Sequence, residues 1–192
     1  MKYHPEANND VVSILEAEGA EVVMPDFVDF FLYTLHNSTF RYKELAGRHR
    51  DKVYGDMGIR YIESLRKNMK KALDESVHFE APKSIREIAK GAEKHLSIGH
   101  QTGEGWFLTG EMVELIESGV NNVFCLQPFG CLPNHIVGKG MIKELRKSYP
   151  KANIVPIDYD PGVSEVNQVN RIKLMLSVAK QALEEECREN VI

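Results

Sequence analysis

The sequence has few cysteines, no long apolar segment and no excess of basic residues. Three cysteines among 192 residues are too few for a disulfide framework and favour a reducing cytoplasm. No apolar run approaches the roughly 20 residues that a membrane helix needs. The net charge of −4 offers no electrostatic basis for nucleic-acid binding. We therefore expect a cytoplasmic protein whose partners include neither nucleic acid nor a membrane.

Two common catalytic motifs are also missing. Gly138-Lys139-Gly140 does not satisfy the Gly-x4-Gly-Lys-[Ser/Thr] pattern of a phosphate-binding loop, because glycine follows the lysine. The Gly-x-Ser-x-Gly pattern of a serine-nucleophile turn is absent. The sequence gives no reason to expect a nucleotide P-loop or an acyl-transfer triad.

Short apolar runs alternate with helical periodicity, which predicts an α/β fold. We expect strands at about 2–4, 20–24, 122–126 and 153–157. They would form a small parallel sheet of the Rossmann or flavodoxin-like type, with helices on both faces, in a single three-layer domain of residues 1–192. Because 2–4 looks like the end of a truncated strand, the chain is expected to be a fragment of a larger protein.

A helical insertion is predicted at about 27–97, between two of these strands. Apolar residues at helical spacing indicate two helices there, and Ser84 with Glu87 forms the sequence of a capping box for a third. The expected apolar faces are Phe27, Phe30, Phe31 and Leu35 on the first helix, and Ile59, Ile62, Leu65, Met69 and Leu73 on the second, with Arg66 on the solvent side.

The segment 121–140 carries the strongest chemical signal. Pro128 and Gly130 are expected to end the strand 122–126, because proline lacks an N–H and glycine permits positive φ. Asn134 is predicted to be the N-cap of the next helix. Cys131 would then lie beyond the carboxyl end of a strand and beside a helix N-terminus, where ligands bind in open α/β sheets and thiolates are favoured.

The other two cysteines have simpler explanations. Cys125 lies within the apolar strand, where a buried structural thiol is the favoured interpretation. Cys187 lies among charged residues near the end and is expected to be incidental. An iron–sulfur cluster takes several thiolates at one point, so this chain could supply only one or two of the ligands, with Cys131 first and Cys125 second.

Further polar residues fall in the predicted loops. His4, His100 and His135 could in principle form a zinc site, although their spacing does not predict one. Glu104 lies in the glycine-rich run 99–105, which could equally serve only as a tight turn. Asp158 and Asp160 follow the last strand, where turn and cap roles are common for aspartate.

Four stretches of the sequence together resemble a known family. They are Lys2-Tyr3-His4-Pro5-Glu6-Ala7-Asn8-Asn9, Gly103-Glu104-Gly105-Trp106, Gln127-Pro128-Phe129-Gly130-Cys131-Leu132-Pro133-Asn134-His135 and Ile157-Asp158-Tyr159-Asp160-Pro161-Gly162. This set, spread over almost the whole chain, resembles the large CoA-substrate-specific enzyme activases. These proteins are related to the activator and the cluster-bearing subunits of 2-hydroxyacyl-CoA dehydratases of anaerobic metabolism.

The resemblance implies a function in electron transfer. In that family an ATPase module drives electrons toward a dehydratase, and the dehydratase-like module holds an iron–sulfur cluster between two α/β domains. This chain resembles the second, C-terminal domain of that module. Cys131 matches a position expected to ligate the cluster, of [4Fe–4S] or another type, while His4, Glu104 and His135 match motif positions of unassigned catalytic role.

The sequence lacks the ATPase motifs and the further cysteines of the family. The chain alone is therefore expected neither to hydrolyse ATP nor to hold a stable cluster, and its expected partners are preceding domains of the same polypeptide, with a homodimer as a further option. Two alternatives stay open: a catalytic 2-hydroxyacyl-CoA dehydratase subunit, and a cluster-free interaction or scaffold domain in which Cys131 only packs.

Overall fold

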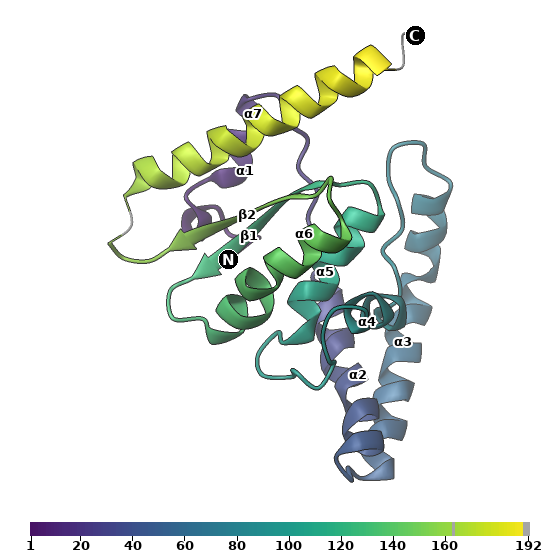
Figure 1. Ribbon diagram of the computed structural model, residues 1–192. Coiled ribbons are helices and arrows are strands. Elements are labelled where there is room, and N and C mark those ends of the chain that lie inside the picture. Colours follow the sequence, from purple (N-terminus) through teal and green to yellow (C-terminus); the bar gives the residue numbers. More distant parts are fainter. Residues whose placement is uncertain (163, 190–192) are drawn as a thin grey trace. The chain divides into compact units, whose positions relative to one another are not determined.

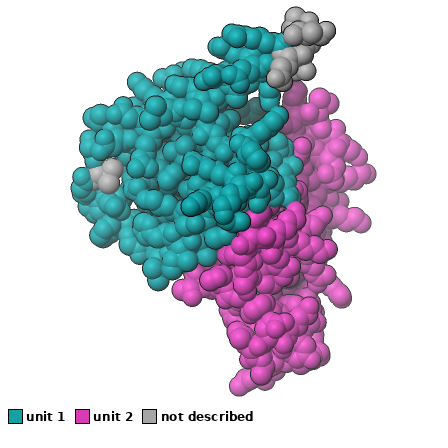
Figure 2. All heavy atoms as spheres, viewed as in Figure 1, with its two compact units in different colours: residues 1–24, 115–192 teal, residues 25–114 magenta. Residues whose placement is uncertain are grey.

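The computed structural model describes residues 1–162 and 164–189 (Figure 1). Contacts divide the chain into two compact units, which Figure 2 distinguishes by colour. Unit 1 comprises residues 1–24 and 115–192, and unit 2 comprises residues 25–114. Each unit is described by itself.

Unit 1 contains a small sheet with helices around it. Its elements are the 3₁₀-helix η1 (Pro5–Asn8), α1 (Val11–Ala17), β1 (Asn122–Pro128), the π-helix η2 (Asn134–Gly138), the 3₁₀-helix η3 (Lys139–Met141), α6 (Ile142–Ser148), β2 (Asn153–Tyr159) and α7 (Glu165–Glu189). This confirms the predicted mixed α/β class with a small parallel sheet, whereas its Rossmann or flavodoxin-like topology stays a prediction.

The strands predicted at 122–126 and 153–157 are confirmed as β1 and β2, and they pair with each other in parallel. The register runs from Asn122 opposite Asn153 to Pro128 opposite Tyr159. β1 continues through Pro128, so the prediction that this proline ends the strand after Leu126 was wrong. In a two-stranded sheet each strand has an unpaired edge, and proline is tolerated where its missing N–H faces such an edge.

The predicted strand at residues 2–4 is wrong, because local hydrogen bonds occupy its backbone. His4 N donates to Met1 O at 3.0 Å, which closes a turn. The buried Asn8 side chain donates through Nδ2 to Met1 O and Lys2 O, both at 3.3 Å. Asparagine side chains that bond nearby carbonyls in this way compete with strand pairing.

The predicted strand at residues 20–24 is also wrong. Gly19, with φ of 85°, ends α1 in a Schellman motif, in which Gly19 N donates to Glu16 O and Ala20 N to Leu15 O. The following residues form no regular secondary structure and belong to no ladder in the described sheet. Val22 packs partly on the core, whereas Val23 is exposed. A short apolar run alone does not provide a strand with a pairing partner.

Helices cover both faces of the sheet within unit 1 (Figure 1). On one face, α1 and α7 pack on β2 through a buried cluster. Its members are Val11, Leu15, Ile157, Ile172 and Leu176. On the other face lie η2, which contacts β1, and α6, which contacts β2. The burial of apolar side chains on both faces is what holds two short strands in place.

Unit 2 is helical, which confirms the predicted helical character of residues 27–97. It contains α2 (Val28–Glu44), α3 (His49–Asp74) and α4 (Ile85–Glu93), together with most of α5 (Trp106–Glu117). The capping box at Ser84 and Glu87 is present as predicted. Among the residues that the structure describes, no helix combines the length with the apolar character that a membrane crossing requires.

The core of unit 2 uses a different face of α2 from the predicted one. Phe27, Phe30 and Phe31 are exposed, so the prediction was wrong for these three residues, whereas Leu35 of the same predicted face packs partly on the core. The buried residues of α2 are Asp29, Leu32, Tyr33 and Asn37. Asn37 Oδ1 accepts a hydrogen bond from the buried Trp106 Nε1 at 2.9 Å. Polar residues can line this face because each has a partner there.

Arg66 was predicted to face solvent, but only 6% of its surface is exposed. Its guanidinium pairs with Asp29 at 2.8 Å, Asp26 at 2.9 Å and Glu63 at 3.3 Å. Burial raises the pKa of Asp29 to about 6, against the opposing effect of Arg66. This ion cluster joins α2 to α3, and the sequence spacing within α3 alone could not reveal it.

Replacing Arg66 by methionine should destabilise unit 2 strongly, because it would leave the buried Asp29 carboxylate without its cation. We expect Arg66→Met to lower the free energy of unfolding by about 3 kcal/mol, as measured by urea denaturation at neutral pH. Lys67→Met changes an exposed neighbour and should cost little. Equal losses for the two variants would contradict the buried ion cluster.

Glu114 provides a pH-dependent test. Burial raises its pKa from 4.5 to about 6, although its side chain accepts a hydrogen bond from Lys83 N. The folded state therefore binds this proton more tightly, and stability falls as pH rises from 4.5 to 6. Glu114→Gln should gain about 1 kcal/mol above that range and nothing below it. An equal stability difference at both ends, measured by urea denaturation, would contradict this assignment.

Candidate functional site

The candidate site is the carboxyl end of the sheet, where Cys131 follows β1. Cys131 N donates to Pro128 O at 3.1 Å, which closes a turn. Gly130 has φ of 65°, the conformation that glycine provides at this position of a type II turn. Cys131 is half-buried, between the exposed Phe129 and Leu132. The predicted position of this thiol, beyond a strand and in a turn, is confirmed.

The helical segment after the turn begins earlier than predicted. His135 N donates to Cys131 O at 3.2 Å, so the first helical hydrogen bond starts at Cys131. Asn134 lies inside the segment and makes no capping bond, so its predicted N-cap role was wrong. Its buried side chain instead donates through Nδ2 to Cys131 Sγ at 3.1 Å. This contact fixes the sulfur over the start of the helix.

Cys125 is buried, at 8% exposure, as expected for a structural thiol. Gln127 Nε2 donates to its sulfur at 2.9 Å. Gly138 packs against this pair, since a Cβ there would lie 3.2 Å from Cys125 Sγ. Gln127 is fully buried, yet its Oε1 accepts no hydrogen bond from the described residues. An unsatisfied buried acceptor is costly, so a donor from outside the chain would be favourable here.

Three of the four stretches that carry the family resemblance meet at the carboxyl end of the sheet. The N-terminal stretch joins β2 where Tyr159 Oη donates to Asn8 O at 3.0 Å. Burial raises the pKa of Tyr159 to about 12, so its hydroxyl remains a donor. Gln168 bridges the two, because its Oε1 accepts from Asn9 and its Nε2 donates to Asp158 O. These stretches are far apart in the sequence.

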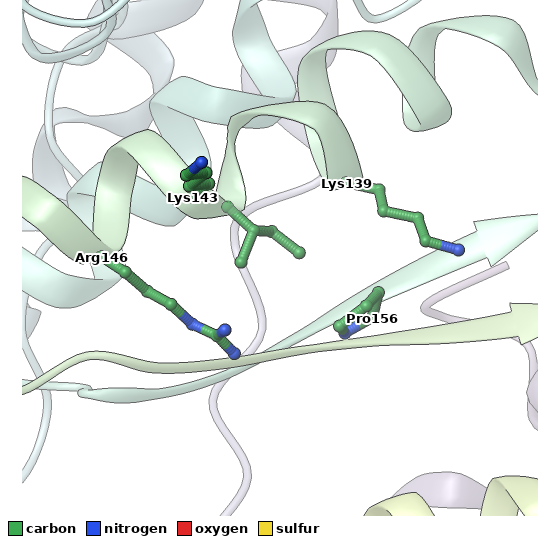
Figure 3. A pocket seen from close by; sticks show the side chains of 5 residues that line it. Lys139, Lys143, Arg146 and Pro156 are labelled. Carbon is green, nitrogen blue, oxygen red and sulfur yellow. The ribbon is translucent and has the colours of Figure 1, made fainter.

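A shallow basic hollow of about 320 Å³ is lined by residues of η3, α6 and the middle of β2. Its lining residues are Lys139, Ile142, Lys143, Arg146 and Pro156. Figure 3 shows Lys139 and Arg146 on the helical side of the strand that carries Pro156. Lys139 Nζ pairs with Asp158 at 2.9 Å, and Arg146 donates to Ile154 O. The lining carries three cations, so it favours anions electrostatically.

The remaining predicted candidates are divided between the two units. His4 and His135 are exposed in unit 1, whereas His100 and Glu104 belong to the loop in unit 2. Within residues 1–162 and 164–189, no group of three or more His, Cys, Asp or Glu side chains could hold a metal ion. The zinc site considered from the sequence therefore has no counterpart in the described residues, and a cluster would need ligands from elsewhere.

The glycine-rich loop has a clear structural role. Tyr33 Oη donates to Gly103 O at 2.9 Å, and Trp106 N donates to His100 O at 2.7 Å. Gly105 has φ of 47°, and a Cβ there would overlap His100 O. The loop thus needs glycine to close over the aromatic core of unit 2. Glu104 is half-buried there, and its functional role stays a prediction.

Sequence reasoning missed the amide side chains of the site. Gln127 and Asn134 each donate to a thiol sulfur, and Gln168 links the N-terminal stretch to β2. One available signal was the position of Gln127, a polar residue in an otherwise apolar strand. Gln168 lies in the first turns of an exposed-looking helix and offered no comparable signal.

Comparisons with known proteins add no assignment. No family model matches the sequence, and neither the curated proteins nor the solved structures include a significant match. The resemblance to the activase and dehydratase proteins therefore stays a prediction, and the site is interpreted from its own geometry.

The three thiols should differ in their reactivity in the native protein. Cys187 is exposed, Cys131 is half-buried and Cys125 is buried. We expect iodoacetamide to modify Cys187 first and Cys131 next, while Cys125 reacts only after unfolding. Peptide mass spectrometry over a time course measures this order. Cys125 reacting before Cys131 would contradict the described site, and complete protection of Cys131 would favour the packing role.

Proposed function

We propose that this chain is an electron-transfer module that contributes the Cys131 thiolate to an iron–sulfur cluster at the boundary with another domain or chain. One observation carries the proposal. Three of the stretches that resemble the family, including the one with Cys131, meet at the carboxyl end of the sheet. The proposed family is that of the CoA-substrate-specific enzyme activases and 2-hydroxyacyl-CoA dehydratases.

The surroundings of Cys131 are compatible with this thiolate as one ligand of a cluster, but they do not provide the other ligands. Its sulfur is half-buried and accepts a hydrogen bond from Asn134 Nδ2, and hydrogen bonds to ligating sulfurs tune a cluster's reduction potential. Cys125 is the second choice, but its burial beneath Gly138 leaves it less accessible. The remaining ligands would come from outside the described residues.

A bound cluster would supply one-electron redox chemistry at low potential. This chain's own contribution would be to hold the sulfur in place through the turn at Gly130, to donate from Asn134, and to shield one side with the sheet. In the complete protein the ATP-dependent step would belong to a different module, since residues 1–192 contain no phosphate-binding loop.

Cys131→Ser should remove most of the iron from the complete gene product purified under anaerobic conditions. Iron analysis and the visible absorption of the cluster measure the effect, without any assay of activity. Cys187→Ser alters an exposed thiol and serves as the matched control, which should retain its iron. Unchanged iron and absorption in Cys131→Ser would contradict the proposed ligand role.

Two other functions remain as alternatives. A catalytic 2-hydroxyacyl-CoA dehydratase subunit is expected to be encoded beside a separate small ATPase activator, so gene neighbourhood distinguishes it from an activase. A cluster-free scaffold would need no iron, and Cys131→Ser would then leave both iron content and partner binding unchanged. The exposed apolar side chains of unit 2 favour an interaction role alongside either alternative.

A further inference from the structure

The two outer edges of the sheet can be told apart from the pairing of β1 with β2. Asn153 N donates to Asn121 O, and the parallel register continues in step as far as Pro128 and Tyr159. In a parallel ladder only alternate residues of a strand bond to the neighbouring strand. The odd-numbered residues of β1 and β2 therefore bond to each other. The even-numbered residues point their backbone groups toward the outer edges.

The outer edge of β2 is closed to a further strand. Each of its three outward carbonyls accepts a hydrogen bond from a side chain. Arg146 donates to Ile154 O, Arg171 Nη1 to Pro156 O at 2.7 Å, and Gln168 Nε2 to Asp158 O at 2.8 Å. Pro156 also lacks an N–H. Proline and charged side chains are common means by which proteins protect the edge of a sheet.

The outer edge of β1 has no such protection. Phe124 and Leu126 direct both of their backbone groups outward, and none of the residues that the structure describes bonds to those groups. Both side chains are half-buried against the apolar cluster of unit 1. Unpaired backbone groups beside an apolar core are costly. A further strand would satisfy all four groups at once, because its own N–H and C=O groups alternate with the same spacing.

The N-terminal segment lies where a preceding strand would end. Asn8 Nδ2 donates to Met1 O and Lys2 O, and Asn8 O accepts from Tyr159 Oη at the end of β2. Met1 is thereby held toward the carboxyl end of the sheet. A strand that leads into Met1 would end there, so it would run parallel to β1 and β2. Because the edge of β2 is closed, such a strand would add to β1.

The helix after the N-terminal segment is placed to cover such a strand. α1 packs in the same cluster as Phe124 and Leu126, and its Val12 and Ile14 are only partly buried. In α/β folds, the helix that follows a strand packs back on the sheet to which that strand belongs. Val12 and Ile14 therefore offer apolar surface to a strand beside β1.

We propose that a strand of the polypeptide preceding Met1 in the complete gene product adds in parallel to the outer edge of β1. It would be an apolar run of about five residues. This proposal rests on the expectation that the chain belongs to a larger protein. It does not depend on the role of Cys131, so strand addition and iron binding can succeed or fail separately.

Amide hydrogen exchange, followed residue by residue, tests the proposal. In the 192-residue chain the amides of Phe124 and Leu126 should exchange quickly, whereas those of Cys125 and Gln127 are slow because they bond to β2. In the complete gene product Phe124 and Leu126 should exchange at least about a hundredfold more slowly. The amide of Asp158, on the closed edge, is the matched control and should not change. Equal rates for Phe124 and Leu126 in both forms would overturn the proposal.

Proline at position 126 provides a second readout. Leu126→Pro removes an outward N–H, which only an unpaired edge tolerates, and Leu126→Ala is the matched control for the lost side chain. The difference between their urea midpoints should be small in the 192-residue chain. It should be clearly larger in the complete gene product, because the proline ring blocks the added strand. The same difference in both forms would contradict the proposal.

Two further results would also overturn the proposal. A gene whose reading frame begins at Met1 would leave no preceding strand to add. Protection of Phe124 and Leu126 that grows with the concentration of the 192-residue chain would instead assign the open edge to a second copy.

Discussion

The pairing of β1 with β2 is the interaction on which unit 1 depends. Seven residue pairs, from Asn122 with Asn153 to Pro128 with Tyr159, align the carboxyl ends of both strands. Because the strands are parallel, the segments that follow them leave the sheet at the same end. The turn at Cys131 and the loop after Tyr159 are neighbours for this reason, although about thirty residues separate them in the chain.

Side-chain amides hold the N-terminal segment and the Cys131 turn at the carboxyl end of the sheet. Asn8 holds the N-terminal turn, Asn134 and Gln127 each donate to a thiol, and Gln168 connects Asn9 with Asp158. Buried amides of this kind are stable only when they are paired, so they specify one arrangement of loops. Together with the two paired strands, these amides fix the position of the half-buried Cys131 sulfur.

The sequence predicted those elements that depend on local chemistry. Two apolar runs became β1 and β2, glycines ended α1 and α5, and Ser84 capped α4. Residues 2–4 do not form a strand, because the Asn8 side chain bonds the backbone there. Residues 20–24 do not form one either, because no described strand pairs with them. The burial of Arg66 could not be predicted, since its carboxylate partner Asp29 lies on another helix. At the site, the turn placement of Cys131 followed from the spacing of proline and glycine, whereas its bond from Asn134 required coordinates.

The central claim is that the Cys131 sulfur ligates an iron–sulfur cluster whose other ligands come from outside this chain. The most direct measurement is an anomalous difference map at the iron absorption edge, from crystals of the complete protein grown without oxygen. The account predicts an iron peak bonded to Cys131 Sγ at a boundary with another domain or chain. Iron bound only to other residues, with Cys131 still held solely by Asn134, would contradict it.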